Sequence, residues 1–128
     1  MCRTPRAIRL LLTGVASAWL AAGVAACSHG VGVGANRTVR IALSEYRVIP
    51  QSVRASPGQL VLVVENHGRL AHDLAVSGHG QILAQTPPLL PGATAVLSLA
   101  LRPGHYLMSS TLFSDQALGA YGTLNVSS

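Results

Sequence analysis

Cysteine is nearly absent from this chain of 128 residues, and both copies, Cys2 and Cys27, lie close to the N-terminus. From Ser28 onward the sequence therefore has no thiol with which to form a disulfide or a thiolate metal ligand. Any metal site or catalytic site in that part of the chain has to be built from other side chains.

Charge is also sparse, because charged side chains make up only 10% of the sequence. Lysine is missing, and nine arginines against four acidic residues give a formal net charge of +5. Arg3, Arg6 and Arg9 supply three of these positive charges, and the remainder of the chain contains no basic run. This pattern argues against a nucleic-acid partner, while an apolar content of 49% excludes wholesale disorder.

Catalytic signatures are missing as well. The sequence has no Gly-rich phosphate loop, no pair of catalytic carboxylates and no nucleophile elbow. No segment after the N-terminal region has the periodicity of a long helix, and Gln81–Gln85 and Asp115–Leu118 are each expected to form a helical turn at most. These absences favour a non-enzymatic domain.

The N-terminus has the pattern of an export segment. Met1–Arg9 is positively charged, Leu10–Val24 is apolar, and the small residues Ala25 and Ala26 precede Cys27. The run Val24-Ala25-Ala26-Cys27 resembles the bacterial lipoprotein signal. The resemblance implies cleavage before Cys27 and a thioether-linked lipid on its sulfur.

The chain is thus predicted to have three parts: a helical signal peptide (1–26), a lipidated cysteine with a flexible polar tether (27–36), and one folded domain (37–128). An ordinary secretory signal cut near Ala26 and an uncleaved membrane span over Ile8–Ala26 are the alternatives. We expect the folded domain to lie outside the cytoplasm, anchored in the bacterial cell envelope by its lipid.

The folded domain has the pattern of an all-β protein. Short β-rich runs are separated by turn sequences such as Ser56–Gly58 and Arg102–Gly104, which is typical of a sandwich or barrel. Leu60–Glu65 is continuously apolar up to its last residue, as expected of a strand buried on both faces. The other runs with strand character are Thr38–Ser44, His72–Val76, Thr94–Leu101, His105–Thr111 and Tyr121–Val126. We predict a two-sheet Greek-key β-sandwich with a single core.

Three fragments, in this order, resemble the cupredoxins, a family of blue-copper β-sandwiches. The fragments are Asn66–Gly68 with His72–Val76, Pro91–Gly92 with Thr94–Leu101, and Arg102–Tyr106 with Gly119–Val126. The first is similar to the stretch that delivers the first copper-binding histidine, and the last to the final hairpin of the family. The resemblance spans Val39–Val126 and implies a cupredoxin-like fold.

Blue-copper chemistry uses two histidines, one cysteine and usually a weak axial methionine. Carried over position by position, the first histidine falls on His72, whereas the cysteine position falls on Ser110. The second histidine and the methionine fall on Asp115 and Ala120. A neutral hydroxyl cannot replace the soft, covalent thiolate, so the resemblance implies the fold without a type 1 copper centre.

Copper binding by a different ligand set is the competing hypothesis. His72 with His67, Asp115 or Met108 would supply borderline and soft donors for an envelope copper carrier or sensor. Strand parity predicts instead that Met108 faces the core and that His105 points to solvent. We therefore expect no cofactor, with copper as the one to test.

His72, Ser110 and Asp115 are also the residue types of a hydrolytic triad. The simpler interpretation is that Asp115 hydrogen-bonds His72 and fills the polar hole that a metal ion would otherwise occupy. No oxyanion hole is identifiable, so a hydrolase is the least favoured of the three hypotheses.

The favoured hypothesis is a non-catalytic domain that binds an envelope protein or a small ligand. Its candidate surface is the end of the sandwich formed by Asn66–His72 and Leu112–Ala120. A docking patch there would consist of the apolar side chains Leu112, Phe113, Leu118 and Tyr121, unless these only anchor the loops in the core. The predicted partners are the membrane, through the lipid, and an envelope protein or small ligand.

Overall fold

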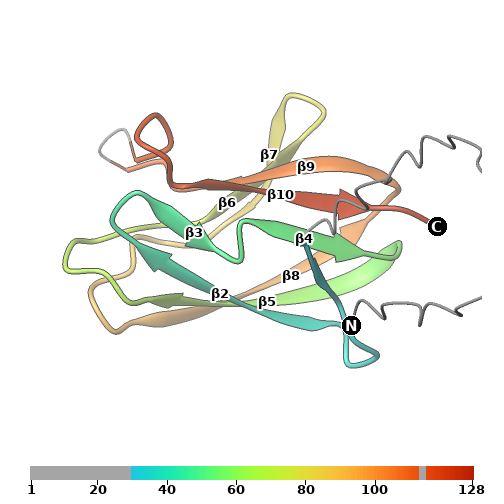
Figure 1. The fold of residues 1–128 in the computed structure, drawn as a ribbon, viewed down its shortest axis with the longest axis horizontal. Coiled ribbons are helices and arrows are strands. Elements are labelled where there is room, and N and C mark those ends of the chain that lie inside the picture. The colour runs from blue at the N-terminus through green and yellow to red at the C-terminus, as the bar shows by residue number, and fades with distance from the viewer. Residues whose placement is uncertain (1–29, 113–114) are drawn as a thin grey trace, which may run out of the picture.

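Two β-sheets packed face to face make up the part of the chain that the computed structural model describes, residues 30–112 and 115–128 (Figure 1). The expected signal peptide, Cys27 and Phe113 lie outside these residues. Within them, no helix has the length and apolar character needed to cross a membrane. The all-β sandwich predicted from the alternating runs is confirmed.

The two sheets differ in size. The larger sheet has six strands, in the order β1 (Val31–Gly32), β4 (Ser52–Ala55), β10 (Tyr121–Val126), β9 (Gly104–Ser109), β6 (Ala75–Gly78) and β7 (Gln81–Gln85). The smaller sheet has four, in the order β3 (Arg47–Ile49), β2 (Thr38–Ser44), β5 (Gly58–Asn66) and β8 (Thr94–Leu101). β4 runs parallel to β1 and β10, and β2 runs parallel to β5. The other neighbouring strands are antiparallel.

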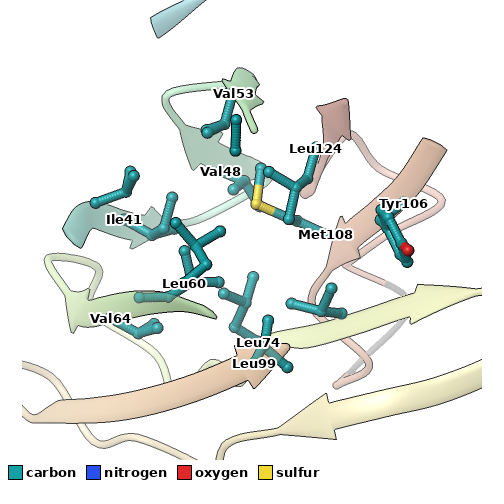
Figure 2. Close-up of a cluster of buried hydrophobic side chains, with 14 of the residues drawn as sticks. Ile41, Val48, Val53, Leu60, Val64, Leu74, Leu99, Tyr106, Met108 and Leu124 are labelled. Carbon is teal, nitrogen blue, oxygen red and sulfur yellow. The ribbon is translucent and has the colours of Figure 1, made fainter. Parts of the chain in front are cut away.

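The hydrophobic core lies between the sheets and follows the alternation of side chains along each strand. In β2, Val39, Ile41 and Leu43 are buried, as the sequence pattern predicted. Leu124 of β10 and Met108 of β9 are fully buried and belong to the same cluster (Figure 2). Burying each such side chain contributes about 1.5–3 kcal/mol, so this interface between the sheets dominates the stability of the fold.

The expectation that β5 is buried on both faces is wrong. Leu60, Leu62 and Val64 have no exposed surface, but Val61 and Val63 on the other face are only half-buried. The physical reason is that the smaller sheet packs against the larger one on a single face. Its outer face is open, and valine there is tolerated because β-branched side chains suit a half-buried strand.

The expectation of no more than a helical turn at Gln81–Gln85 is also wrong, because this segment is strand β7. His79 and Gly80, between β6 and β7, both have positive φ, 53° and 75°. Two consecutive residues in this region form the tight turn that matches the twist of a β-hairpin. The turn folds Gln81–Gln85 back onto β6, where pairing with Ala75–Gly78 overrides the weak local preference.

One end of the sandwich gathers the connecting segments that build the site, at the left of Figure 1. The chain turns there between β2 and β3, between β5 and β6, between β7 and β8, and between β9 and β10. Backbone hydrogen bonds join two of these connections, since His72 and Leu89 exchange N–H and C=O in an isolated bridge. β6 consequently starts at Ala75 rather than at His72.

Candidate functional site

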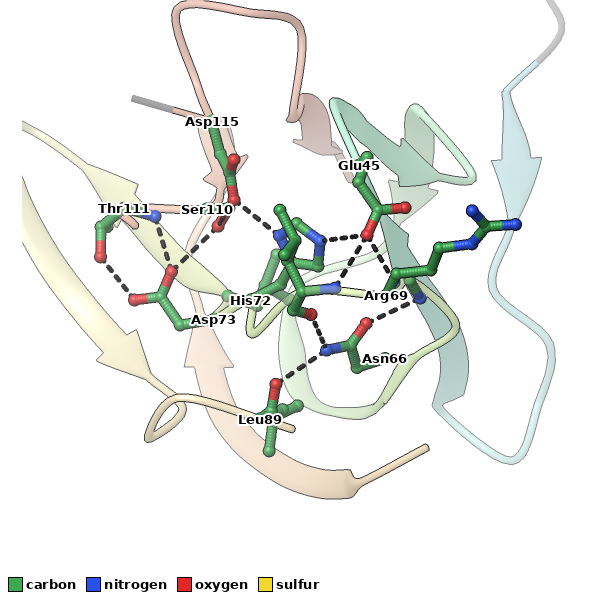
Figure 3. A network of polar contacts seen from close by, with 12 residues as sticks. Glu45, Asn66, Arg69, His72, Asp73, Leu89, Ser110, Thr111 and Asp115 are labelled. Atoms are coloured by element: carbon green, nitrogen blue, oxygen red, sulfur yellow. Dashed lines mark hydrogen bonds and ion pairs between the residues drawn. The ribbon is translucent and has the colours of Figure 1, made fainter. Parts of the chain in front are cut away.

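A network of polar side chains fills this end of the sandwich (Figure 3). Glu45 comes from the β2–β3 turn, His72 and Asp73 from the loop before β6, Ser110 from the end of β9, and Asp115 from the segment before β10. These side chains include three of the four acidic residues in the whole chain. Among the described residues, no buried side-chain nitrogen or oxygen lacks a hydrogen-bond partner. The site is thus a closed set of polar contacts.

His72 stands at the centre of the network and is only 1% exposed. Its ring Nδ1 lies 2.6 Å from Asp115 Oδ2, and Nε2 lies 3.5 Å from Glu45 Oε1. The short contact with Asp115 Oδ2 fits an N–H donated by Nδ1, because a carboxylate oxygen accepts hydrogen bonds. The contact between Nε2 and Glu45 lies at the outer limit of hydrogen-bond distance and places a carboxylate beside this nitrogen.

Asp115 is positioned by its own turn and by Ser110. The Asp115 N–H donates to Leu112 O, and the Asp115 carbonyl accepts from the Ala120 N–H. Ser110 Oγ lies 2.8 Å from Asp115 Oδ2 and 3.1 Å from Asp73 Oδ1. A hydroxyl has one proton, so Ser110 donates to one carboxylate at a time and links the two.

Asp73 is buried, but its carboxylate accepts several hydrogen bonds from neighbouring residues. The Thr111 N–H lies 2.6 Å from Oδ1, and Gln85 Nε2 lies 2.8 Å from Oδ2. The Thr111 hydroxyl also donates to Oδ2. Burial on its own raises the pKa of Asp73, but the hydrogen bonds from Thr111, Gln85 and Ser110 outweigh it and lower the pKa below its ordinary value. The charged form of Asp73 is therefore favoured.

Glu45 closes the other side of the His72 ring. Its Oε1 accepts the backbone N–H groups of Arg69 and Leu70, the second at 3.0 Å. These hydrogen bonds, led by that from Arg69, lower the pKa of Glu45 from 4.5 to about 2. A Cβ on Gly68 would lie 2.6 Å from Glu45 Oε1 and 2.9 Å from His72 Nε2, so only glycine allows the loop to pass this close.

The loop that carries His72 is fixed by Asn66, which has no exposed surface. Its Nδ2 donates to Leu70 O at 2.8 Å and to Leu89 O at 2.7 Å, and its Oδ1 accepts from the Gly68 N–H at 2.8 Å. One side chain thus ties the loop to itself and to the β7–β8 connection. The sequence indicated only a turn at this position, because these bonds depend on tertiary contacts.

The structure brings together the four positions that the cupredoxin resemblance assigns to copper ligands. His72, Asp115 and Ser110 are joined by side-chain hydrogen bonds, and the Ala120 carbonyl accepts from the Ser110 N–H at 3.0 Å. The bond between Asp115 and His72 is the one that the simpler sequence interpretation expected. Glu45 and Asp73 complete the network and were not singled out by sequence.

The other proposed metal ligands are not part of this cluster. His67 is exposed, and its Nε2 lies 3.0 Å from Glu65 Oε2. Met108 has no exposed surface and packs in the core, while His105 is exposed, as strand parity predicted. Across residues 30–112 and 115–128, no three His, Cys, Asp or Glu side chains are arranged to hold a metal ion. The donor set at His72 does not fit type 1 copper, because a thiolate is lacking.

Two shallow depressions flank the turn that holds Asp115. The first, of about 630 Å³, is lined by Leu107, Ser110, Thr111, Gln116, Ala117 and Tyr121. The second, of about 460 Å³, is lined by Tyr46, Arg47, Val48, Ile49, Gln51 and Gly119. Of the expected docking residues, Leu118 is 58% and Tyr121 is 44% exposed, whereas Leu112 is half-buried. Exposed Tyr46 and Ile49 extend the apolar surface, and sequence reasoning missed them because β3 was not predicted.

The two packed sheets and the position of His72 define a cupredoxin-like domain. No protein-family profile and no curated protein matches the sequence. Solved structures do match: the dithionite-reduced auracyanin of the photosynthetic bacterium Roseiflexus castenholzii has a TM-score of 0.67 at 19% identity, covering 74% of this chain and 100% of that chain.

Two further auracyanins are similar. Auracyanin B has a TM-score of 0.65 at 18% identity and covers 71% of this chain and 88% of its own. Auracyanin A, described as a "blue" copper protein of the green thermophilic photosynthetic bacterium Chloroflexus aurantiacus, has a TM-score of 0.62 at 16% identity, covering 75% and 99%. These similarities establish the cupredoxin-like fold.

Proposed function

We propose that this chain is a non-catalytic, cupredoxin-like domain that binds an envelope protein without using a type 1 copper centre. We further propose that a lipid on Cys27 anchors it in the bacterial cell envelope, outside the cytoplasm. Only three residues separate Cys27 from β1 in the sequence, which supports a domain held close to its anchor.

The observation that carries the proposal is the buried hydrogen bond between His72 Nδ1 and Asp115 Oδ2, with Glu45 Oε1 3.5 Å from Nε2. A metal ion at Nδ1 of His72 would have to displace Asp115 and its hydrogen bond, and one at Nε2 would lie beside the Glu45 carboxylate. Separating a buried pair by removing one partner typically costs about 3–5 kcal/mol, because the other partner is left without compensation. The network therefore occupies the place of a metal centre and stabilises this end of the sandwich without one.

The arrangement does not support a hydrolase. A triad requires the serine hydroxyl to donate to the histidine, which then acts as general base. Ser110 Oγ instead contacts the carboxylates of Asp115 and Asp73, so its proton is not directed to His72. The non-catalytic assignment rests on this geometry.

The exposed apolar residues beside the network supply the binding surface. Tyr121 lines the first depression, Tyr46 and Ile49 line the second, and exposed Leu118 follows Ala117 of the first in the chain. Aromatic and aliphatic side chains on a rigid base are the usual anchors of a protein interface. The buried network supplies that base, since it fixes the turn from which Leu118 projects.

The binding proposal is tested by photocrosslinking in intact envelopes. A photoreactive amino acid at Leu118 is compared with one at Pro57, an exposed residue in the turn between β4 and β5 at the opposite end of β5. We expect an adduct of one discrete mass from position 118 only. No adduct at position 118, or equal adducts at both positions, would count against a docking site at this end.

The anchoring proposal has its own test. Cys27→Ser is expected to move the protein from the membrane fraction to the soluble fraction. Mass spectrometry of the wild-type N-terminal peptide should show a diacylglyceryl-type mass on Cys27. An unmodified Cys27 thiol in membrane-associated protein would contradict the anchor.

A further inference from the structure

The outer edge of β8 is the least protected strand edge in the described part of the chain. β8 has eight residues, Thr94–Leu101, and lies last in the four-stranded sheet (Figure 1). It pairs with β5 along its whole length on one side. Among residues 30–112 and 115–128, no strand pairs with its other side.

The other three edges carry the usual protective features. β1 has only two residues, and β3 has three, including the exposed Arg47, and is followed by Pro50. β7 has five residues and joins its sheet through a register shift at Val76/Ser77. Native sheets use short strands, charges, proline and bulges to prevent edge-to-edge pairing. β8, with the sequence TAVLSLAL and an uninterrupted register, has none of these.

The chain segment that contains β8 and its neighbour β7 carries no charged side chain. No arginine, lysine, aspartate or glutamate occurs from Leu74 to Leu101, a segment that includes β7, which contacts β8. Ile82, Leu90 and Val96 on this segment are 57%, 69% and 62% exposed. Along β8 itself, a second molecule meets apolar and backbone groups, and the nearest charges are Glu65 and Arg102 at its two ends.

The hydrogen bonds of the neighbouring strands show which backbone N–H and C=O groups of β8 point away from β5. The Val61 N–H donates to Arg37 O, just before β2, whereas the Asn66 N–H donates to Ala93 O, just before β8. Backbone N–H groups alternate between the two sides of a strand. The backbone groups of the even-numbered residues of β5 therefore point toward β8. The register pairs Leu62 with Leu97, so the backbone N–H and C=O groups of the odd-numbered residues of β8 point toward β5. The outward-facing backbone groups of β8 are therefore those of Thr94, Val96, Ser98 and Ala100.

We propose that a second copy of this chain pairs with this edge, β8 against β8, antiparallel about a two-fold axis at Leu97. The four outward-facing residues are symmetric about Leu97, so the edge is complementary to itself, as an isologous interface requires. Val96 of one copy then lies opposite Ser98 of the other, and Thr94 opposite Ala100. The two four-stranded sheets become one continuous sheet.

A second copy fits this edge better than the N-terminal region of the same chain or a charged partner. The described chain begins next to β1, which is the edge of the larger sheet opposite to β7. The net positive charge of the protein disfavours self-contact through its arginine-bearing strands, such as β2 and β3. β8 has no charged side chain. Its edge is therefore free of this repulsion and has no charge with which a charged partner could pair.

Charge substitutions at the paired positions test the dimer. The full chain in mild detergent is examined by sedimentation velocity over a range of concentrations, and we expect a dimer. In the two-fold dimer, V96K/S98K places a lysine at position 96 of each copy opposite a lysine at position 98 of the other. This like-charge repulsion should weaken dimerisation by about tenfold or more. V96K/S98E, at the same positions, pairs opposite charges and should restore the dimer. A monomeric wild type, or a V96K/S98K variant that dimerises as tightly as wild type, overturns the proposal.

Cysteine crosslinking tests the register independently. Leu97 on the axis is a non-hydrogen-bonded pair, with Cα atoms about 4.5 Å apart, which lies within disulfide range. L97C should form a disulfide-linked dimer on mild oxidation, whereas T123C, at an exposed position on β10, should not. Both variants retain Cys2 and Cys27, so equal crosslinking of the two would show that β8 is not the interface.

Discussion

Asp115 is the residue on which the site depends most. Its Oδ2 accepts from both the His72 ring at 2.6 Å and the Ser110 hydroxyl at 2.8 Å, and its side chain is almost fully buried. In the cupredoxin resemblance, this position belongs to the second copper-binding histidine. In this chain the position carries an acidic acceptor instead, and His72 Nδ1 is hydrogen-bonded to it.

Removing the Asp115 carboxylate should be strongly destabilising. Asp115→Ala leaves the ring N–H of His72 and the hydroxyl of Ser110 with one acceptor fewer in a buried site. We expect a loss of about 3 kcal/mol in the free energy of unfolding, measured by urea denaturation. Gln116→Ala, at an exposed position in the same turn, should change stability by less than about 0.5 kcal/mol. An Asp115→Ala protein as stable as wild type would show that the network does not hold this end together.

Glu45 should make stability depend on pH in the acid range. Its pKa is lowered from 4.5 to about 2 in the folded protein, so the folded state favours the ionised form. The stabilisation from this group is complete above pH 4.5 and is lost as the pH falls from 4.5 toward 2. Glu45→Gln should therefore lose less stability than wild type between pH 5 and pH 2.5. A carboxyl NMR titration that places the pKa of Glu45 at 4.5 or higher would contradict this account.

Three substitutions at the positions that the cupredoxin resemblance assigns to copper ligands test whether the loops still have the geometry of a copper site. The triple variant S110C/D115H/A120M supplies a thiolate, a second imidazole and a thioether beside His72. We expect it to bind copper with an intense blue absorption band, and D115H alone to show no such band. A triple variant that folds, as judged by circular dichroism, but remains colourless with copper would mean that the loop geometry has diverged as well.

At the scale of elements, the loop between β5 and β6 is shaped by Gly68. A Cβ at this position would meet Glu45 Oε1 and His72 Nε2 at distances well below van der Waals contact. Gly68→Ala should lower the free energy of unfolding by about 1–3 kcal/mol, measured by thermal or urea denaturation. Gly32→Ala in β1, where no atom lies within 4 Å of the added Cβ, is the matched control and should be nearly neutral. Equal stability of both variants would show that the loop moves aside freely.

Elements with their own periodic pattern were predictable from the sequence. Thr38–Ser44, Thr94–Leu101 and Tyr121–Val126 were predicted with the bounds that β2, β8 and β10 have. β4 was missed because its four residues depend on parallel pairing with β10, which is distant in sequence. β7 was missed because its side chains are mostly exposed and carry no alternation between apolar and polar residues.

The site was predictable only where a family pattern existed. The resemblance placed His72, Ser110 and Asp115 together, and the structure joins them by hydrogen bonds. Glu45 and Asp73 were not predicted, since their roles follow from loop contacts with Arg69 and Thr111 rather than from spacing. The scarcity of acidic residues was the one available indication, because three of only four acidic residues gather around one histidine.

At the scale of the whole molecule, the fold resembles that of blue-copper proteins, whereas the side chains at the ligand positions differ. The sandwich matches blue-copper proteins over nearly their full length, yet the soft ligands are absent from the corresponding positions. His72 is present at the first of these positions, with Asp115 Oδ2 2.6 Å from its Nδ1 and Glu45 Oε1 3.5 Å from its Nε2.

Copper titration of the full chain, followed by calorimetry and by the midpoint of thermal unfolding, tests the central claim most directly. A ligand that binds the folded state tightly raises this midpoint. We predict that wild type takes up no stoichiometric copper and keeps the same midpoint, and that His72→Ala behaves in the same way toward copper. Uptake of one equivalent by wild type, with a raised midpoint that His72→Ala abolishes, would contradict the account and establish a copper site at His72.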